Sequence, residues 1–293
     1  MNIALVTDSD RIGLTHDDLP LIAAFARKGD QAIPTDWADP AVPWETFDAI
    51  VIRSPWDYHA RWRAFEQWLS RVELLPLWNP AKVLRWNLAK TYLLELEAAG
   101  LPVIPSLRLP PDQAPSLAKA IERWGEIIVK PEVGAGGAWT YRANADSQSK
   151  IEELILPRLC SRDPAQPSVG FLVQPFLPKI FEGEWSLVYL DGVYSHAVRK
   201  TAASGGQFLI HEEYGGRVDP GAPTPDLVAI GDTFAAYITD IPYMRVDLVG
   251  DGADALLVEL ELVEPELFFR FSAGSDDKFV EAIRRRALRH QTA

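Results

Sequence analysis

Two apolar stretches near the C-terminal end carry charged side chains at alternate positions: Arg245-Val246-Asp247 and Val258-Glu259-Leu260-Glu261-Leu262. A β-strand turns successive side chains to opposite faces, so each stretch would present its charged residues on one face. A loop centred on Ala253 would fold the two stretches into an antiparallel hairpin with Asp247 opposite Glu259. The segment therefore predicts a hairpin that gathers carboxylates on one face.

Carboxylates gathered in this way need something to offset their charge. Like charges that face each other destabilise a sheet, and two carboxylates about 5 Å apart repel by roughly 3 kcal/mol at an effective dielectric of about 20. Asp247, Glu259 and Glu261 stand among Leu and Val residues, so we expect a cation between them. Ligation by carboxylate oxygens alone favours Mg²⁺ or Mn²⁺ over zinc. The alternative is an exposed hairpin whose carboxylates face solvent.

The composition is that of an ordinary globular protein, with 293 residues of which 47% are apolar and 24% charged. The net charge of −12 argues against nucleic acid as a partner, because proteins that bind a phosphate backbone are usually basic. The single cysteine, Cys160, cannot form an internal disulfide, which favours the cytoplasm. No apolar run is as long as a membrane span, and the N-terminus leads directly into a short strand rather than a signal peptide.

Residues 1–80 are expected to form an α/β unit with a parallel sheet, because short apolar strands alternate with helical patterns. The strands are expected at residues 3–6 and 49–52, and the helices at 17–28 and 59–72. Loops that follow the strands of a parallel sheet are common ligand sites. The two loops are Asp8-Ser9-Asp10-Arg11 and Arg53-Ser54-Pro55-Trp56-Asp57-Tyr58; each is equally consistent with a purely structural role.

Two further units are expected, a small α/β unit over residues 81–172 and a mostly antiparallel unit over 173–293. In the first, a helix at 87–99 ends at Gly100, and a strand at 127–130 precedes a glycine loop, a short strand at 139–142 and a helix at 147–158. The second contains strands at 184–190 and 193–200, joined by an Asp-Gly turn, and a closing helix at 276–290.

One segment is suited to an anion. Lys130 ends a strand and precedes a glycine loop with Gly136 and Gly137, whose backbone N–H groups can approach an anion closely. The spacing matches neither a Walker loop nor a dinucleotide fingerprint, and an ordinary mobile hairpin loop explains it equally well. Lys90, in the expected helix at 87–99, would by itself be assigned to solvent.

Three other elements have simple structural explanations as well. Pro175 leaves backbone groups free beside Gln174, Phe176 and Leu177, as any strand end with a proline does. Glu184 follows a glycine and could be a surface residue. Arg199 and Lys200 are adjacent on an expected strand, so no more than one of them faces a given site.

Taken in order, these elements resemble the ATP-grasp superfamily of ligases, over residues 78–275, and residues 1–80 resemble its N-terminal preATP-grasp domain. The resemblance implies an α/β (α+β) ATP-grasp fold that binds ATP with Mg²⁺ or Mn²⁺. The site residues that it implies are Lys90 and Lys130 for the phosphates, with Gly136 and Gly137 in the covering loop; Gln174, Phe176 and Leu177 for adenine; Glu184 for ribose; Arg199 or Lys200 for phosphate or the substrate carboxylate; Arg245 for the developing oxyanion; and Asp247, Glu259 and Glu261 for the metal.

The sequence departs from the superfamily pattern at Glu261, which stands where an Asn is usual, and at Pro265, which comes one residue late. A substrate loop is expected near Ser272, Gly274 and Ser275. Within the superfamily the chain resembles the group that includes O-ureido-D-serine cyclo-ligase, which closes the D-cycloserine ring. The motifs for this are Arg53 to Tyr58, Leu77-Trp78-Asn79-Pro80, Gly183-Glu184-Trp185-Ser186, Ser195 to Lys200, and Glu212-Glu213-Tyr214-Gly215-Gly216.

The activity implied is amide-bond formation, through an acylphosphate, on a small amino-acid-like substrate, with ring closure within one molecule as one form of it. Side chains at residues 54–58 and 207–213 are expected to select that substrate. The alternatives are a regulatory module that binds ATP without turnover, a peptide ligase of the glutathione-synthetase type, and an interaction protein whose acidic hairpin is solvated. Homodimers are common in the superfamily, so a homodimer is one assembly that the resemblance implies.

Overall fold

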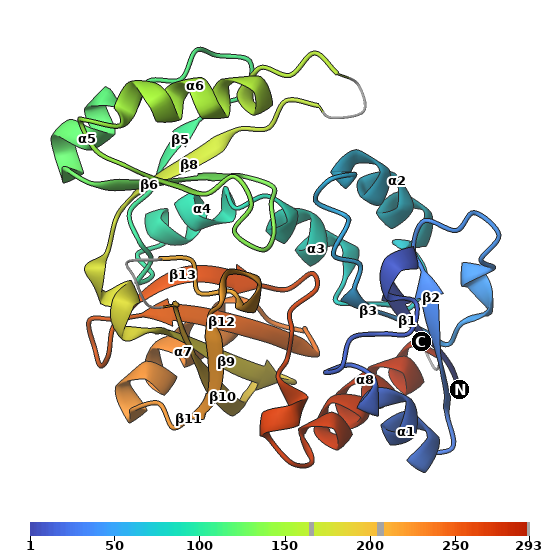
Figure 1. Cartoon of the computed structure of the whole chain (residues 1–293). Coiled ribbons are helices and arrows are strands. Elements are labelled where there is room, and N and C mark those ends of the chain that lie inside the picture. The colour runs from blue at the N-terminus through green and yellow to red at the C-terminus, as the bar shows by residue number, and fades with distance from the viewer. Residues whose placement is uncertain (164–166, 204–207, 292–293) are drawn as a thin grey trace.

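The computed structural model describes residues 1–163, 167–203 and 208–291. Its strands form three sheets, each with its own helices (Figure 1). The unit with α5 and α6 lies above the C-terminal sheet, α4 lies between the two, and α3 connects α4 to the N-terminal unit (Figure 1). The expected α/β class and ATP-grasp fold are confirmed.

The N-terminal sheet is parallel, with strands in the order β2 (Gln31–Asp36), β1 (Asn2–Thr7), β3 (Ala49–Ser54) and β4 (Leu77–Trp78). Ile3 and Leu5 pack on one face, under α1 (Pro20–Arg27) and α8 (Ser275–Gln291). Ala4 and Val6 pack on the other, under α2 (Trp62–Val72) and α3 (Ala81–Leu88). Helices thus bury both faces, which explains why β1 and β3 are almost continuously apolar.

The sequence did not predict β2. Its residues alternate poorly and include Pro34, which cannot donate a ladder hydrogen bond. The structure places β2 at the edge of the sheet, next to β1 alone. A proline is tolerated at such an edge, so the residue that argued against a strand also accounts for its position.

The central sheet is antiparallel, in the order β5 (Leu107–Leu109), β8 (Phe171–Pro175), β6 (Ile127–Pro131) and β7 (Tyr141–Ala143). Helices α5 (Ala118–Trp124) and α6 (Gln148–Leu159) pack on it around Ile127, Val129 and Phe171. The expected boundary between residues 172 and 173 falls inside β8. The strand expected at 139–142 begins later, because Trp139 has a φ of +60°, outside the extended region.

The C-terminal sheet is antiparallel, in the order β11 (Arg217–Gly221), β10 (Val193–Thr201), β9 (Glu184–Leu190), β12 (Tyr243–Val249) and β13 (Leu256–Glu261). Helices α4 (Tyr92–Ala98) and α7 (Pro225–Tyr237) share one core with it. Short 3₁₀ helices occur at Ser9–Arg11, Trp44–Thr46, Pro178–Glu182, Glu212–Tyr214 and Phe269–Phe271.

Helix α7 was also missed from the sequence, although Thr224 caps it through the N–H of Leu227 and Pro225 opens it. Gly231 interrupts its apolar pattern. A β-carbon at Gly231 would lie 2.3 Å from the Tyr189 hydroxyl oxygen, so the glycine allows the helix to approach the sheet. The sequence therefore signals the start of the helix through Thr224 and Pro225, but Gly231, which its packing against the sheet requires, weakens the helical pattern in the middle.

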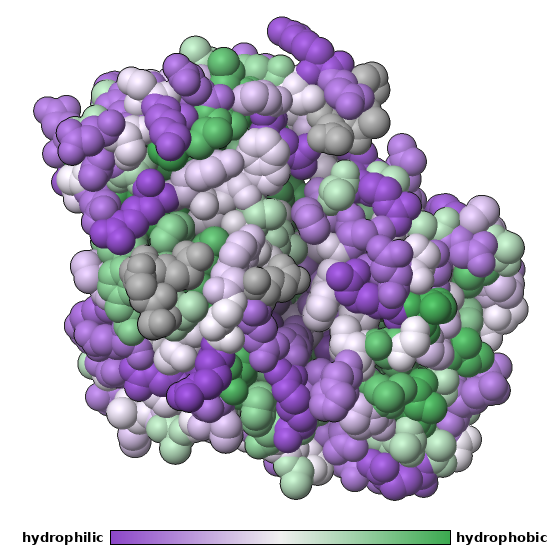
Figure 2. All heavy atoms as spheres, viewed as in Figure 1, coloured by the Kyte–Doolittle hydropathy of each residue, from purple (hydrophilic) through white to green (hydrophobic). Residues whose placement is uncertain are grey.

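Much of the large aromatic content packs inside the N-terminal unit. Trp37, Trp44 and Trp68 are each 3% exposed, and the Trp68 ring makes edge-on contacts with the other two. The face of the molecule in Figure 2 is largely hydrophilic, with apolar residues in small separate patches. Among the described residues, no helix has both the length and the apolar character needed to cross a membrane.

Candidate active site

Strands β12 and β13 form the predicted hairpin and its register is confirmed: Asp247 pairs with Glu259, and Arg245 with Glu261. A regular hairpin with Asp247 opposite Glu259 would pair Leu248 with Val258. Instead, Leu248 pairs with Leu257, which leaves Val258 in a bulge and makes the turn one residue shorter. The bulge restores the register that brings the charged side chains onto one face. It therefore orients Glu259 and Glu261 together.

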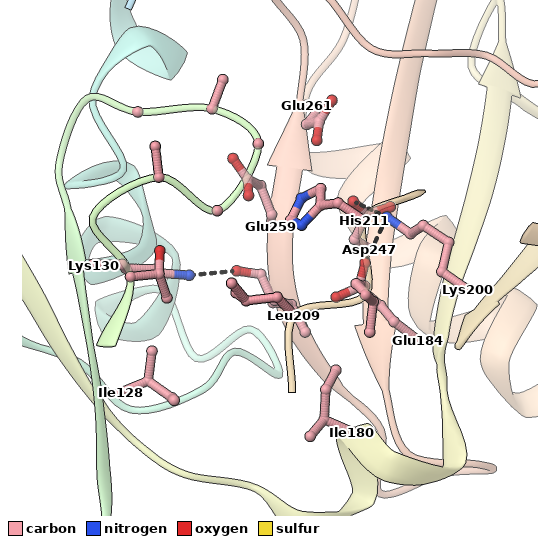
Figure 3. A pocket seen from close by; sticks show the side chains of 18 of the residues that line it. Ile128, Lys130, Ile180, Glu184, Lys200, Leu209, His211, Asp247, Glu259 and Glu261 are labelled. Carbon is pink, nitrogen blue, oxygen red and sulfur yellow. Dashed lines mark hydrogen bonds and ion pairs between the residues drawn. The ribbon is translucent and has the colours of Figure 1, made fainter. Parts of the chain in front are cut away.

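Asp247 is held by three other side chains. Arg245 donates from Nε to Oδ1 at 2.9 Å and from Nη2 to Oδ2 at 2.9 Å, and the Ser186 hydroxyl donates to Oδ1 at 2.6 Å. Lys200 Nζ lies 3.2 Å from Oδ2 (Figure 3). Although burial opposes it, Arg245 and Lys200 lower the pKa of Asp247 well below its usual range.

The two glutamates of β13 also have basic partners. Lys90 Nζ lies 2.7 Å from Glu259 Oε1, and Arg245 donates to Glu261. Part of the positive charge expected between these carboxylates is therefore supplied by lysine and arginine side chains of the same chain. In the described part of the chain, no three His, Cys, Asp or Glu side chains are grouped as a ready metal cage.

Two carboxyl groups of this cluster are nevertheless disfavoured in their charged forms, which a bound cation would stabilise. Burial, Asp247 and Glu259 raise the pKa of Glu261 to about 8 even though Arg245 opposes the shift. Burial raises the pKa of Glu264 to about 7. The available donors are all carboxylate oxygens, the ligands that Mg²⁺ prefers. The donor chemistry therefore fits Mg²⁺, provided that Lys90 or Arg245 gives up part of its contact.

Lys90 is not in a helix, contrary to expectation. Helix α3 ends at Leu88 and α4 begins at Tyr92, and Ala89 between them is extended. The Lys90 amide donates to the Glu132 carbonyl at 2.7 Å, and its Nζ donates to the Gly134 carbonyl at 2.8 Å. This break turns the side chain into the protein, toward the glycine loop and Glu259, instead of toward solvent.

Lys130 lies at the end of β6 and is only 8% exposed. Its Nζ donates to the Val258 carbonyl of β13 at 3.2 Å, so it projects from the central unit toward the acidic hairpin (Figure 3). Burial lowers the pKa of Lys130 to about 8. A lysine that has lost so much hydration gains strongly from an anionic ligand, and the glycine loop beside it, with Gly136 and Gly137 at positive φ, offers backbone N–H groups.

These residues line one cavity of about 510 Å³ where the units meet. Every candidate site residue but one contributes to it: Lys90, Lys130, Gly136, Gly137, Gln174, Phe176, Leu177, Glu184, Lys200, Arg245, Asp247, Glu259 and Glu261. The volume suits a small-molecule ligand. Glu184 lies 2.7 Å from Lys200 Nζ and, despite that partner, burial raises its pKa.

The exception is Arg199, and its assignment to the site is corrected. Arg199 pairs with Asp251 at 3.1 Å and stacks on the Trp185 ring at 5.0 Å. Its neighbour Lys200 faces the cavity, because successive side chains of β10 point to opposite faces of the sheet. Strand alternation therefore separates the two residues as expected, and of the two alternatives it is Lys200 that faces the cavity.

The segment after β8 forms one end of the cavity. The Phe176 amide already donates to the Glu126 carbonyl at 2.9 Å, so this N–H does not face a ligand. The Phe176 ring stacks against Arg142, whose guanidinium carbon lies 3.8 Å from the ring centroid. Gln174 Nε2 donates to Ser106 Oγ at 2.9 Å. This end therefore presents apolar surface, with Leu177 as the remaining backbone candidate of the expected adenine segment.

Two cavity residues, His59 and Glu264, escaped the sequence-based assignment, whereas Arg11 and His211 belong to segments that it singled out without giving these side chains a role. His211 lay within the expected 207–213 segment; Gln207 and the Glu213 side chain lie outside what the structure describes. The His211 ring lies among Glu259, Asp247 and Lys200, and burial lowers its pKa to about 4 (Figure 3). Glu264 had a signal, since acidic residues continue beyond Glu261. Ser272, Gly274 and Ser275 do not line the cavity.

The fold and this cavity define an ATP-grasp ligase, an ATP-dependent enzyme that forms carbon–nitrogen bonds. The fold is shared with D-alanine–D-alanine ligase from Bacillus anthracis, solved with ATP, at a TM-score of 0.70 and 12% identity over 100% of this chain and 99% of that one. At this identity the likeness concerns the fold alone.

A closer likeness identifies the family. Residues 3–79 match the family model for the N-terminal domain of D-cycloserine synthetase DcsG. The cycloserine biosynthesis protein DcsG of Streptomyces lavendulae is 31% identical over 302 residues, which cover 97% of this chain and 98% of the relative. The crystal structure of D-cycloserine synthetase DcsG superposes with a TM-score of 0.84 at 29% identity, over 98% of this chain and 100% of that one. The chain belongs to the DcsG family.

Proposed function

We propose that this ATP-grasp ligase joins a carboxylate to a nitrogen within one small amino-acid-like molecule, closing a ring as its D-cycloserine-forming relative does. The observation that carries the proposal is the cavity in which the partly buried Lys90 and the buried Lys130 meet the carboxylate-bearing hairpin. The full-length likeness to DcsG supports the choice of substrate.

Each part of the cavity has a role in this proposal. Lys90 and Lys130 bind the phosphates of ATP, and the loop with Gly136 and Gly137 covers them. The apolar end near Phe176 and Leu177 takes adenine, and Glu184 takes ribose. Lys200 balances the charge of Glu184 and Asp247 and lies within reach of bound phosphate. All are buried or partly buried, which strengthens their electrostatic interactions.

Mg²⁺, or Mn²⁺ in its place, would be held by Asp247, Glu259 and Glu261, whose carboxylate oxygens are the ligands that it prefers. The ion would neutralise charge on the phosphates. The chain's own basic residues share that task, because phosphoryl transfer requires positioning and charge neutralisation more than covalent assistance.

In the reaction, a carboxylate oxygen of the substrate attacks the γ-phosphorus of ATP, the bond to the β–γ bridging oxygen breaks, and ADP leaves. A nitrogen of the same molecule then attacks the acyl carbon, the bond from that carbon to the phosphate oxygen breaks, and phosphate and the nitrogen's proton leave. Arg245 would stabilise the negative charge on the acyl oxygen; comparable oxyanion contacts contribute about 3–4 kcal/mol. Exclusion of water by the glycine loop limits hydrolysis of the acylphosphate.

The test is an assay for ADP release with O-ureido-D-serine, combined with mass spectrometry of the product. We expect ADP to form in proportion to substrate consumed and the product to have the mass of the closed ring. D-Serine, which lacks the ureido nitrogen, is the matched control and should yield no ring. ADP release without a ring-closed product would reject ring closure, and no ADP with O-ureido-D-serine would reject the proposed substrate.

A further inference from the structure

Glu264 differs from the other glutamates in its part of the cavity. Glu259, Glu261 and Glu266 form ion pairs with Lys90, Arg245 and Arg270, respectively. Within the described residues, no lysine, arginine or histidine forms an ion pair with Glu264, although Glu264 lines the same cavity. A partly buried carboxylate without a basic partner is costly unless a ligand supplies the positive charge.

Tyr58 is the neighbour of this carboxylate on the side of the N-terminal unit. The Tyr58 hydroxyl lies against Glu264, and its ring is 5% exposed and packs on Phe65 at 5.1 Å between ring centroids. Burial raises the pKa of Tyr58 well above its usual value, so the hydroxyl stays protonated and can donate to the carboxylate. Tyr58 comes from the loop after β3, and Glu264 from the segment after β13. The N-terminal unit and the C-terminal unit therefore each contribute one member of this pair.

Glu264 lies where the ammonium group of a bound α-amino acid is expected. Lys90 and Arg245 are the basic residues whose charges act on the Glu264 carboxyl group. Both belong to the end of the proposed site that binds the phosphates and the oxyanion. A substrate carboxylate that reacts with the γ-phosphate must lie at that end. In an α-amino acid the ammonium group is on the adjacent carbon, so it must lie within a few ångströms of the reacting carboxylate.

We propose that Glu264, positioned by Tyr58, binds the α-ammonium group of the amino-acid substrate. The proposal rests on the proposed function, since it takes the substrate to be an α-amino acid whose own carboxylate is activated. Trp56 and His59, which line the cavity beside Tyr58, form the adjoining wall. The His59 ring nitrogen Nδ1 lies 2.7 Å from the Trp56 carbonyl oxygen, which fixes this wall. Glu264 is thus a binding residue, and Tyr58 a positioning residue.

The test compares the binding of two ligands by calorimetry in the presence of a non-hydrolysable ATP analogue and Mg²⁺. The ligands are O-ureido-D-serine and its analogue with hydrogen in place of the amino group, 3-(ureidooxy)propanoic acid. Wild type should bind the amino compound at least about tenfold more tightly, because a charge-assisted hydrogen bond is lost with the analogue. Glu264→Gln should remove most of that preference while binding of the nucleotide and the Mg²⁺ requirement stay unchanged.

Two further variants separate recognition from packing. Tyr58→Phe should reduce the preference by a smaller factor, because the carboxylate remains and loses only its positioning contact. Glu266→Gln is the matched control: its carboxylate already pairs with Arg270, so the preference for the amino group should persist.

Three outcomes would overturn the inference: equal binding of the two ligands by wild type, no binding of either ligand, or a Glu264→Gln variant that keeps the preference. A Glu264→Gln variant that instead needs more Mg²⁺ would make Glu264 a metal ligand and would likewise overturn it. Because binding is measured apart from turnover, absence of ADP release would reject the proposed function while leaving the ammonium site supported by the binding preference.

Discussion

Buried charge at the scale of single residues is what most distinguishes the cavity. Lys130 has lost most of its hydration, and burial lowers its pKa to about 8, whereas Asp247 is buried with two basic partners that lower its pKa. The charge of Lys130 would be stabilised by a bound anion, whereas the charge of Asp247 is already stabilised by side chains of the protein. Lys130 is therefore suited to binding an anion, whereas Asp247, beside its proposed role toward Mg²⁺, holds Arg245 and Lys200 in place.

The lowered pKa of Lys130 predicts the pH dependence of ATP use. Below about pH 8 the side chain is charged and binds phosphate; above it the charge is lost. The charges of Glu259 and Glu184 oppose the lowering of the Lys130 pKa, and the charge of Lys90 adds to it. We expect kcat/KM for ATP, which reports the free enzyme, to fall as the pH rises through about 8. Lys130→Arg, charged throughout, should lack this fall; an identical profile in the variant would refute the assignment.

The partners of Asp247 predict an effect on stability. Asp247→Asn removes the carboxylate that Arg245 and Lys200 share and leaves each with one other acidic partner, Glu261 and Glu184 respectively. Loss of one partner from a buried ion pair costs about 3–5 kcal/mol, and the remaining partners place the expected loss at the lower end of that range. Chemical denaturation at pH 7 measures this, with Ser186→Ala, which removes one neutral donor, as the milder control. The pKa of Asp247 is lower in the folded protein than its usual value of 3.8. The extra stability of wild type over Asp247→Asn is therefore fully present above pH 3.8 and declines as the pH falls below that value. An advantage that persists undiminished at the lowest pH at which the protein stays folded would contradict this origin.

Sequence reasoning at this scale succeeded where strand alternation decides the outcome and failed where the backbone departs from regular structure. Period-two alternation identified the shared face of Arg245 and Asp247, and it separated Arg199 from Lys200. It could not reveal that Lys90 lies in a helix break. Leu88, Leu93 and Leu96 keep an apparently continuous apolar pattern across that break.

At the scale of elements, the glycine loop and the segment with His211 together close the cavity. A β-carbon on Gly137 would lie 3.1 Å from Leu209 Cδ2 and 3.3 Å from the His211 ring, and Gly137 has a φ of +71°. The two segments are therefore in close contact, and only glycine fits between them without displacement. This contact joins the central unit to the C-terminal unit above the proposed phosphate site.

A pair of glycine variants tests this contact. Gly137→Ala and Gly252→Ala both place a side chain at positive φ, which costs about 1–2 kcal/mol in either case. A β-carbon on Gly252 would have no other atom within 4 Å, so this variant should bind ATP normally. Gly137→Ala should in addition raise KM for ATP, about tenfold or more if the displaced segments cost about 1.4 kcal/mol. Equal KM values in the two variants would show that the contact does not affect nucleotide binding.

The hairpin shows how far element prediction could go. The register was predicted correctly from the positions of the charges, yet the turn is shorter and the bulge at Val258 makes up the difference. Bulges have no reliable sequence signal, because they satisfy the requirements of neighbouring strands. The same limit applies to Gly231, whose role depends on Tyr189 in another element.

At the scale of the whole molecule, the chain's last helix completes its first sheet. Helix α8 lies beside α1 (Figure 1), and Arg27 pairs with Asp276 at 3.0 Å and with Asp277 at 2.8 Å. Phe279 of α8 is fully buried and packs on Tyr243 of the C-terminal sheet and on Phe269. The N-terminal unit, which supplies Tyr58, is therefore fixed to the C-terminal sheet, whose last strand leads into the segment with Glu264.

Removal of the Phe279 ring should loosen both sheets at once. Phe279→Ala should lower the free energy of unfolding by about 3–5 kcal/mol, and hydrogen exchange should show lost protection in β1 and β12 together. Leu74→Ala, at a side chain that is 89% exposed, should change stability by less than about 0.5 kcal/mol. Loss of protection in one sheet alone would show that the two units are not coupled through α8.

The central claim, that this cavity uses ATP for ligation, is tested most directly by ADP release with O-ureido-D-serine in wild type and in Lys130→Ala. Circular dichroism and chemical denaturation should first show that the variant is folded. We predict substrate-dependent ADP formation by wild type and a rate reduced at least a hundredfold, or about 2.7 kcal/mol, in the variant. A folded Lys130→Ala protein that releases ADP at the wild-type rate would contradict the account.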